Sequence, residues 1–351
     1  MILNSKEEIN NFFTKLYKLD PNISDIFLNE KKGLAFRSKN KINKKLKLKS
    51  EYLKVIFTAF FYQLSLLERE IYRETKSLDT SYSLNNTRYR ITFYKEYQGN
   101  SIAIRLLEQN PWEFKEIGIE DKVINEMTSN SSGLILISGP TSSGKSTTMN
   151  SLINSIGNNN DYHIITIENP IEFIYNENRS FFSQREIGTD VSNYEQAIRD
   201  AMRSNPNVIG IGEIRDTKSA LQALRASQTG HLVISTIHAE STINTIERFI
   251  GLFDENEKKL IKSDFSTVLK GIINQRIIKT TDDDVVMIYE HILGTNDIGN
   301  KIKDDSNNLV QIRTIMESRG YETLDIKLKR LYDTGKISKE IYDNNKSSFI
   351  N

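Results

Sequence analysis

The sequence has no cysteine, no long apolar run and no excess of charge of either sign. The lack of cysteine excludes disulfide bonds and cysteine-ligated zinc modules, and it fits a reducing compartment. Lys and Arg number 47 against 46 Asp and Glu, so the charge of the whole chain indicates no particular partner. Nucleic acid is disfavoured as a partner, because phosphate contacts need a clustered basic surface.

The apolar stretches are too short to cross a membrane. The most apolar helix candidate, residues 55–67, is interrupted by polar residues and is well short of the ~20 residues that span a bilayer. Residues 1–8 show no basic segment followed by an apolar core, so we expect no signal peptide. Together these absences predict a soluble, cytoplasmic protein without a transmembrane segment.

The first part of the chain, residues 1–107, has the pattern of a small α+β domain. A chain of 351 residues exceeds one ordinary domain, so at least two are expected. Apolar periodicity and turn residues predict a helix over 6–19, strands over 24–29 and 34–37, one long helix over 51–74, and strands over 87–94 and 101–107. Residues 108–115 are the predicted linker, since Pro111 breaks structure and the apolar pattern pauses there.

Nine Lys or Arg residues and no acidic residue lie between residues 31 and 50. This basic run is either a contact for an acidic partner or anionic lipid, or a solvated strand and turn. Charges regularly interleaved with aromatic residues, as on nucleic-acid platforms, are not found there, and this favours the solvated surface.

The clearest motif is a glycine-rich loop between a predicted strand and a predicted helix. The apolar run 133–138 predicts a buried strand, and residues 149–153 can open a helix. Between them lies the P-loop pattern, which binds the phosphates of a nucleoside triphosphate through backbone N–H groups. Lys145 adds a point charge and Ser146 is placed to ligate Mg²⁺. The predicted binding residues are Gly139, Pro140, Thr141, Ser142, Ser143, Gly144, Lys145, Ser146 and Thr147.

Residues 116–351 have the pattern of an α/β domain. Strands rich in Ile, Leu and Val alternate with helical patterns, which predicts a mostly parallel sheet with helices on both faces. The predicted strands lie at 133–138, 163–167, 207–211 and 231–236. From about residue 256 the sequence is predicted to be helical, with one apolar stripe formed by Leu260, Phe265, Val268, Leu269, Ile272 and Ile273. A short strand over 285–290 precedes a helical tail.

Carboxylates follow two of these strands. Glu213 follows the strand that normally lies beside the P-loop strand, so it can activate or position the attacking water. Gly212 stands where a second acid is usual, which leaves the metal short of a carboxylate. Glu168 or Glu172 could hold Mg²⁺ through water, and the alternative is that both are only polar strand-end residues.

Two of the four histidines flank one predicted strand. His238, at its carboxyl end, is a candidate sensor of the γ-phosphate, and His231, at its amino end, could pack across a subunit boundary. Their spacing makes no obvious metal pair, so zinc is not expected.

Three arginines lie close in sequence to the Glu213 strand. An arginine that completes the charge around a neighbouring subunit's phosphate raises the rate by orders of magnitude. Surface or intersubunit salt bridges are an equally good interpretation. The three residues are Arg199, Arg203 and Arg215.

Four motifs in this order resemble those of the secretion-superfamily ATPases, and most closely the retraction ATPases of type IV pili. The P-loop resembles the family's GPTGSGKST, residues 167–172 its IEDPIE box, residues 212–216 its GExRD box, and residues 229–238 its histidine box. Outside this core, similar elements are Ser24-Asp25-Ile26, Gln184-Arg185-Glu186, Gln311-Ile312-Arg313-Thr314-Ile315 and residues 320–325.

The sequence also departs from the family pattern. Ser142 replaces a glycine of the P-loop, and Asn169 replaces the aspartate of the acidic box. The loss of that negative charge moves the expected metal role to Glu172. The absence of cysteine argues against the extension and type II secretion branches, which often carry a tetracysteine zinc module.

The resemblance implies a PAS-like α+β domain followed by a RecA-like P-loop domain with a helical C-terminal part, assembled as a homohexamer. It implies ATP and Mg²⁺, with catalytic roles for Lys145, Glu172, Glu213 and His238, and arginines at the γ-phosphate such as Arg88, Arg90 or Arg105. The hexamer would then use ATP hydrolysis to turn or lift an inner-membrane pilus platform protein. The ATPase itself would be peripheral to the membrane. Glu213→Gln is expected to abolish turnover.

Three alternatives stay open. A type IVB secretion or conjugation ATPase would carry the same nucleotide motifs and power substrate export. A weakly hydrolysing regulatory scaffold is suggested by Asn169. A DNA motor is disfavoured by the balanced charge.

Overall fold

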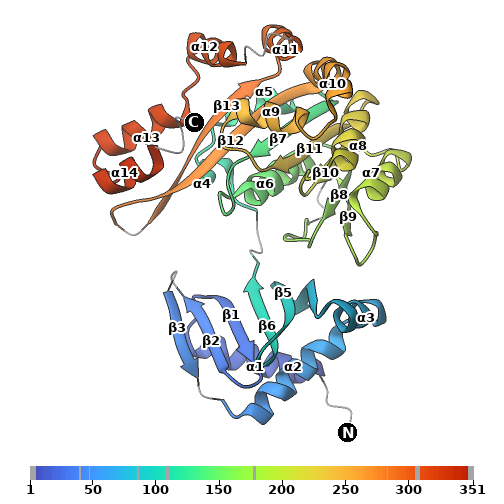
Figure 1. Cartoon of the computed structure of the whole chain (residues 1–351), viewed down its shortest axis with the longest axis vertical. Coiled ribbons are helices and arrows are strands. Elements are labelled where there is room, and N and C mark those ends of the chain that lie inside the picture. The colour runs from blue at the N-terminus through green and yellow to red at the C-terminus, as the bar shows by residue number, and fades with distance from the viewer. Residues whose placement is uncertain are drawn as a thin grey trace. The chain divides into compact units, whose positions relative to one another are not determined.

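The computed structural model describes residues 5–38, 41–46, 48–84, 87–107, 111–176, 179–282, 284–304 and 309–346 (Figure 1). The chain divides into two compact units, each with its own sheet. The first comprises Met1–Asn110 with Pro170–Ile174, and the second comprises Pro111–Asn169 with Tyr175–Asn351. Within the predicted linker 108–115, residues 108–110 lie outside the described residues, and helix α4 (Phe114–Ile117) begins inside it.

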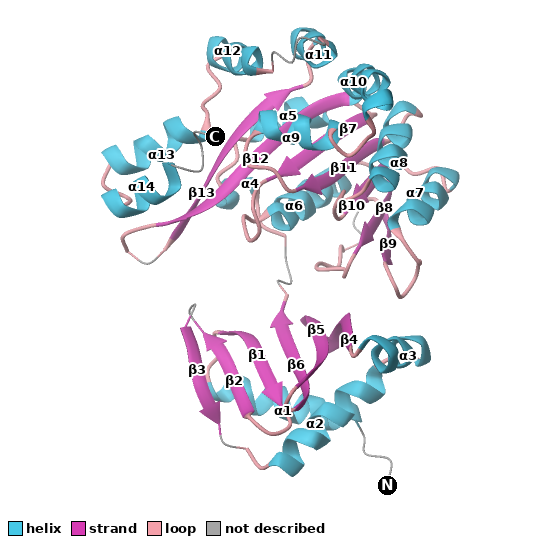
Figure 2. Cartoon of the chain, viewed as in Figure 1, coloured by secondary structure: helices cyan, strands magenta, loops and turns pink. Residues whose placement is uncertain are grey.

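The first unit is built on a six-stranded antiparallel sheet with the order β3-β2-β1-β6-β5-β4. Its elements are α1 (Ser5–Leu19), β1 (Ile23–Asn29), β2 (Gly33–Ser38), β3 (Lys41–Leu46), α2 (Ser50–Gln63), α3 (Leu66–Thr75), β4 (Ser77–Leu84), β5 (Thr87–Glu96) and β6 (Gly99–Leu106). Helices α1 and α2 cover one face of the sheet (Figure 2). Their core is rich in rings: Phe13 stacks on Tyr89 with 4.2 Å between centroids and meets Phe60 edge-on.

The long helix predicted over residues 51–74 is wrong: two helices, α2 and α3, occupy this segment. Ser65 stops the first and caps the second. Its hydroxyl accepts a hydrogen bond from the Glu68 N–H at 3.2 Å, and the Glu68 carboxylate accepts one from the Ser65 N–H at 2.7 Å. This capping box satisfies two N–H groups that a new helix start leaves free, so its local sequence signal overrides the continuous apolar pattern.

The second unit contains a seven-stranded sheet with the order β13-β12-β7-β11-β10-β8-β9. Its strands are β7 (Gly133–Ser138), β8 (His163–Glu168), β9 (Phe181–Glu186), β10 (Val208–Ile211), β11 (Leu232–Ile237), β12 (Leu269–Lys279) and β13 (Val285–Leu293). All neighbours are parallel except the pair β12–β13. Every residue of β7 and β11 is buried, as expected of central parallel strands covered on both faces. The mixed α/β fold class is thus confirmed.

Ten helices of this unit, besides α4, lie in its described part and pack around and beyond the sheet (Figures 1 and 2). They are α5 (Asp121–Thr128), α6 (Lys145–Asn159), α7 (Tyr194–Arg203), α8 (Thr217–Gln228), α9 (Thr242–Ile250), α10 (Glu255–Val268), α11 (Asn296–Lys303), α12 (Val310–Ser318), α13 (Leu324–Asp333) and α14 (Lys339–Lys346). The last four follow β13, so the C-terminal part is helical after that strand.

The predicted helical stripe after residue 256 is wrong beyond Val268. Helix α10 ends there, and the following residues form the long strand β12. Ile272 and Ile273 are both fully buried on opposite faces of the sheet, which a one-faced helical stripe cannot explain. Leu260 is 65% exposed, whereas its neighbour Ile261 is buried. The β-branched run fits a helical spacing by chance, and pairing with β7 and β13 decides its conformation.

A buried carboxylate joins the C-terminal helices to the sheet. Glu290 on β13 accepts hydrogen bonds from the Thr242 N–H at 2.7 Å and the Thr242 hydroxyl at 3.0 Å. Its second oxygen accepts from the Leu324 N–H at 3.2 Å. Helices α9 and α13 therefore both begin at this one side chain. Farther along, α13 packs its apolar face against the β12–β13 hairpin through Leu328 and Ile288.

Candidate active site

The P-loop leaves the end of β7 and curls into the first turn of α6. Three of its residues have a positive φ: Gly139 at 151°, Ser142 at 63° and Gly144 at 82°. A Cβ at Gly139 would lie 2.4 Å from the Gln275 carbonyl oxygen, so only glycine fits there. This curled backbone, ending at the N-terminus of a 15-residue helix, is the kind of concave nest that binds anions.

Ser142 occupies a backbone conformation that favours glycine. Its φ of 63° is left-handed, and it stands where the resembling family has glycine. For an L-residue with a Cβ this conformation costs about 1–2 kcal/mol. The substitution therefore keeps the shape of the loop and adds strain to it.

Lys145 is the first residue of α6, and its ammonium points into the loop. Nζ donates hydrogen bonds to the carbonyl oxygens of Gly139 at 3.1 Å and Pro140 at 2.8 Å. Burial lowers the pKa of Lys145, and the nearby Glu213 carboxylate opposes that shift. The ammonium is thus placed where a phosphate group held by the loop would meet it.

The loop also has an open hydrogen-bonding position. The Ser143 hydroxyl is buried and has no hydrogen-bond partner among the described residues. A phosphate oxygen would supply such a partner. The positive-φ nest, the aimed ammonium and this orphaned hydroxyl together fit a bound nucleoside phosphate.

Glu213, His238 and Lys145 form a chain across the ends of β10, β11 and β7, which are neighbours in the sheet. His238 Nε2 lies 3.2 Å from Glu213 Oε1, and its Nδ1 lies 3.5 Å from Lys145 Nζ. An ammonium only donates, so Nδ1 accepts and the ring proton sits on Nε2, which donates to the carboxylate. His238 thereby fixes Glu213 relative to the phosphate loop.

The protonation state of His238 follows from its surroundings. Burial lowers the pKa of His238, Lys145 lowers it further, and Glu213 acts in the opposite direction. The imidazole is therefore neutral at pH 7. The second Glu213 oxygen lies 2.6 Å from Arg215 Nη2, a contact that raises the pKa of the guanidinium.

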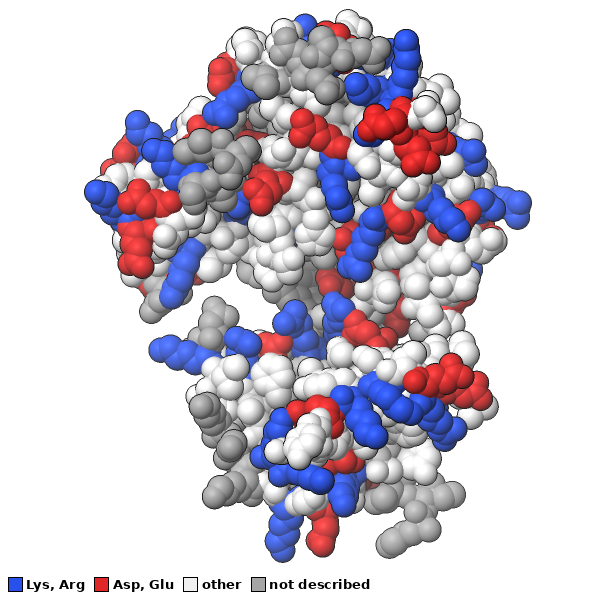
Figure 3. Space-filling view, in the orientation of Figure 1, with Lys and Arg blue, Asp and Glu red and all other residues white. Residues whose placement is uncertain are grey.

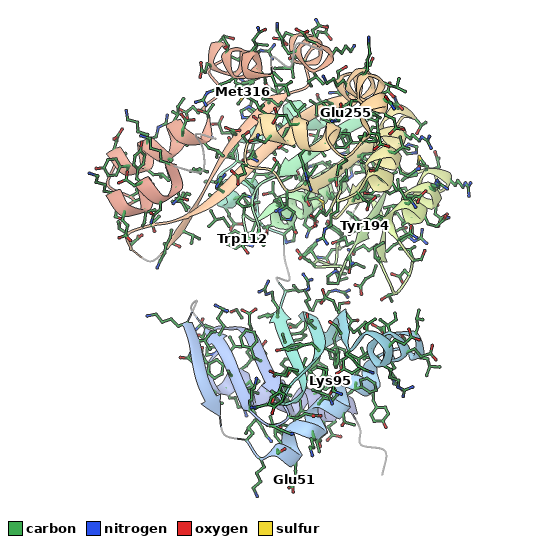
Figure 4. All side chains as sticks on the ribbon, viewed as in Figure 1. Glu51, Lys95, Trp112, Tyr194, Glu255 and Met316 are labelled. Atoms are coloured by element: carbon green, nitrogen blue, oxygen red, sulfur yellow. The ribbon has the colours of Figure 1, made fainter. Side chains whose placement is uncertain are left out.

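The position before Glu213 has little room for a side chain. A Cβ at Gly212 would lie 3.2 Å from the hydroxyl of Tyr194, which opens α7 (Figure 4), and 3.3 Å from the Ile167 carbonyl oxygen. An aspartate here would have to displace these neighbours. The glycine that replaces the usual acid is thus matched by its packing.

The candidate metal residues lie in different places. Ser146 is in the first turn of α6, beside Lys145. Glu168 ends β8, is buried, and accepts a hydrogen bond from the Thr166 hydroxyl at 2.8 Å. Glu172 is half-buried and belongs to the segment Pro170–Ile174, which clusters with the first unit. Within the described ranges no group of three or more His, Asp or Glu side chains could hold a metal by itself.

His231 and the α7 arginines lie apart from the P-loop within the second unit. His231 precedes β11, at the amino end of the parallel strands, and its Nδ1 lies 3.1 Å from the Ala226 carbonyl oxygen. Arg199 pairs with Glu195 at 2.6 Å on the surface of α7, and Arg203 is exposed at the end of the same helix.

The three arginines of the first unit are held by its own residues. Arg88 donates to the Ser81 hydroxyl at 2.6 Å and to the Ile171 carbonyl oxygen at 2.6 Å, the latter in the segment 170–174 of the same unit. The other two arginines form ion pairs: Arg90 with Asp79, and Arg105 with Asp25 at 2.8 Å. Asp25 belongs to the Ser24-Asp25-Ile26 element.

One part of the site was missed in the sequence. Gln275 on β12 donates from Nε2 to the Ser143 carbonyl oxygen at 2.7 Å, so a strand assigned to a helix reaches the P-loop. A signal was present: Asn274-Gln275-Arg276 interrupts an otherwise apolar run.

Comparison with known proteins gives a consistent result. Residues 7–335 match the family model described as "Type II/IV secretion system protein". The type IV pilus retraction ATPase PilT of Pseudomonas aeruginosa is 33% identical over 78% of this chain and 80% of its own length. A twitching motility protein of Neisseria gonorrhoeae is 31% identical over 78% of this chain and 74% of its own length.

A solved structure agrees over almost the whole chain. The crystal structure of the pilus retraction motor PilT with bound ADP superimposes with a TM-score of 0.85 at 34% identity, and the match covers 95% of both chains.

Among the described helices, none combines the length and the apolar character needed to cross a bilayer. Over the second unit, basic and acidic side chains are interspersed on the face that Figure 3 shows.

Proposed function

The chain belongs to the type II/IV secretion system protein family and is an ATP hydrolase, and we propose that it drives the retraction of a type IV pilus. The observation that carries the hydrolysis is the row of contacts Lys145–His238–Glu213 at the carboxyl ends of the parallel strands. It brings a phosphate-binding ammonium and a charged carboxylate into one small site. The similarity to two proteins named for pilus retraction and twitching motility supports the biological role.

Hydrolysis needs three tasks from the residues of this site. The loop N–H groups and Lys145 hold the phosphates and neutralise their charge. Glu213 orients the attacking water and accepts its proton, while Arg215 and His238 fix the carboxylate. Ser146 would hold a Mg²⁺ ion, with Glu172 contributing through water, and the ion would supply positive charge to offset the charge that develops on the phosphates.

The proposal includes assembly as a homohexamer. In such a ring, Arg88, Arg90 and Arg105 would approach a γ-phosphate, and each would exchange its present partner for a phosphate oxygen. Arg199, Arg203 and His231 would lie at subunit boundaries. The proposed partner is a platform protein of the inner membrane, on which the ring acts from a peripheral position.

Steady-state ATP turnover tests the chemistry. Glu213→Gln keeps the shape of the side chain but removes the proton acceptor, so turnover should fall by about 10²-fold or more. Lys145→Ala should weaken nucleotide binding as well. Glu96→Gln is the control, because this carboxylate pairs with Lys32 in the first unit. Wild-type turnover in the Glu213→Gln variant would contradict the assigned role.

Two further measurements test the assembly and the direction of work. Light scattering of the purified protein with nucleotide should give six times the mass of one 40.4 kDa chain, and a monomer would overturn the hexamer. A deletion strain should carry more surface pili than its parent. Unchanged pili together with a loss of exported substrate would replace retraction by secretion.

A further inference from the structure

Strand β12 extends past the point where its neighbour β7 ends. The two strands pair up to Asn274 and Ser138, the last residue of β7 before the P-loop. Strand β12 then continues to Lys279. On the side of β7, its residues after Asn274 therefore run beside the P-loop, whereas on the other side they stay paired with β13. Alternate side chains point to opposite faces.

One face of this extension contacts the P-loop itself. Gln275 is 1% exposed and donates from Nε2 to the Ser143 carbonyl oxygen at 2.7 Å. The same nitrogen lies 3.2 Å from the position of a Cβ at Gly144, and the Gln275 carbonyl oxygen lies 2.4 Å from that position at Gly139. Gln275 thus touches the loop at its start, its middle and the start of α6.

The opposite face holds the loop that carries His238. Asn274 donates from Nδ2 to the Ser138 hydroxyl at 2.8 Å and to the Ala239 carbonyl oxygen at 3.1 Å. Arg276, which is also buried, donates from Nη2 to the Glu240 carbonyl oxygen at 3.3 Å. The two residues that follow His238 are therefore both bound by β12.

We propose that Asn274, Gln275 and Arg276 are positioning residues that set the distance between the P-loop and the His238 loop. These loops carry Lys145 and His238, and their separation fixes the alignment of Glu213 at the phosphates. The proposal deepens the ATPase function above and rests on it. It assigns different effects to the two faces: Gln275 controls nucleotide affinity, and Asn274 with Arg276 controls the chemical step.

The chemistry of the three side chains supports a positioning role over simple packing. The interior of a strand that is buried on both faces favours apolar residues, and burying an amide or a guanidinium costs free energy unless it is hydrogen-bonded. All three donate N–H groups to carbonyl oxygens of irregular loops. Such loops have no ladder of their own, so side-chain donors decide where their carbonyl groups point.

The first test compares two buried glutamines. Gln275→Met removes the donor to the P-loop at nearly constant volume, and Gln222→Met makes the same change in α8, where Gln222 is 2% exposed. ADP affinity is measured by calorimetry, together with the melting temperature of each variant. Gln275→Met should weaken ADP binding about tenfold, as expected for one lost buried hydrogen bond, whereas Gln222→Met should leave it unchanged.

A second variant covers the case in which Gln275→Met does not fold. Gln275→Glu is isosteric and places a carboxylate against the Ser143 carbonyl oxygen and next to the phosphates. It should weaken ADP binding by more than Gln275→Met does. Wild-type ADP affinity in either folded variant would overturn the role of Gln275. These binding measurements do not depend on turnover, so they remain informative if the proposed motor function fails.

The other face is tested by separating kcat from KM. Asn274→Leu and Arg276→Met should lower kcat about tenfold and leave ADP affinity within twofold, because they release the His238 loop and not the P-loop. Gln275→Met should show the reverse pattern. Equal losses of stability in all three variants, with kcat and ADP affinity unchanged below the melting temperature, would show that the residues only pack.

Discussion

The hydrophobic cores of the two units are built from different kinds of side chain. The first buries stacked and edge-on rings between an antiparallel sheet and its helices, whereas the second buries mostly Ile, Leu, Val and Ala around a parallel sheet. In an antiparallel sheet, the amino and carboxyl ends of neighbouring strands alternate. In a parallel sheet, the carboxyl ends of all strands lie on the same side, and there Lys145, Glu213 and His238 meet.

The ionic chemistry differs in the same way. Ion pairs in the first unit join residues of that unit to one another, as in Arg105 with Asp25. In the second unit, charged and neutral polar groups converge on one loop that has an unfilled hydrogen-bonding position. All four histidines also lie in the second unit, and burial lowers the pKa of two of them, His238 and His291. The arrangement of the parallel strands, and not the overall composition, brings these polar groups together at the P-loop.

The largest expected effect is a loss of stability that is confined to one of the two units. Phe13→Ala removes a ring that stacks on Tyr89 and should lower the stability of the first unit by about 3–5 kcal/mol. Scanning calorimetry with and without MgADP identifies the transitions, because only the ADP-binding unit is stabilised by ligand. Phe13→Ala should shift the ADP-insensitive transition. Phe249→Ala, whose ring stacks on Phe265 in the second unit, is the matched control and should shift the other.

One transition that moves with both variants would contradict this independence of the two units.

The next effect is a loss of stability in acid. Burial, with a smaller effect of Lys327, lowers the pKa of His291 from 6.5 to about 4. The unfolded chain therefore binds this proton more readily than the folded one. The contribution is fully present above pH 6.5 and is lost as pH falls towards 4, amounting to about 3 kcal/mol.

His291→Phe should flatten the pH dependence of unfolding between pH 6.5 and 4 while keeping the ring contact with Tyr321, which is 4.4 Å between centroids. Urea melts at several pH values measure it. His163→Phe is the control, since no comparable burial surrounds that half-exposed ring. An unchanged slope in His291→Phe would refute the assignment.

A smaller effect should come from the strained P-loop residue. Ser142→Gly relieves a φ of 63° and gains about 1–2 kcal/mol, offset by the greater freedom of glycine in the unfolded chain, about 0.5–1 kcal/mol. The net result is a slightly more stable second unit. Thr141→Gly, one residue earlier and without a positive φ, should instead destabilise it. Thermal melts of both variants decide, and a loss of stability in Ser142→Gly would argue against the strain.

The smallest effect tests the helix boundary of the first unit. Ser65→Ala removes the hydroxyl that accepts from the Glu68 N–H, and should cost about 1 kcal/mol. Ser65→Asp can replace the cap and should restore most of that loss. No effect of either change would show that the break between α2 and α3 has another cause.

The sequence predicted those features in which local pattern and tertiary packing agree. The apolar strands β7, β8, β10 and β11 end directly at their motifs, so both the strand and its functional end were recognisable. Two of the three positive-φ positions of the P-loop are glycines, so the sequence indicates most of its conformation, and Ser142 is the exception. The chain through His238 could not be predicted, because it depends on the spatial order of β10, β11 and β7, which differs from their order in the sequence.

The failures have equally specific causes. Strand β12 has apolar residues at spacings that also suit a helix, and only pairing with β7 and β13 distinguishes the two. Strands β3 and β4 were not predicted. They are polar and are the two outermost strands of their sheet, where the apolar signal is weak. The domain boundaries and the roles of the site residues stay predictions.

The shared carboxylate of Glu290 has a consequence for cooperativity. It accepts from the first residues of both α9 and α13, so one negative charge faces the positive ends of two helix dipoles. Undocking α13 would leave that charge with one donor fewer and weaken the start of α9. Helix α13 is therefore part of the same unfolding unit as the sheet that forms the nucleotide site, and the two should exchange their amide protons with similar protection.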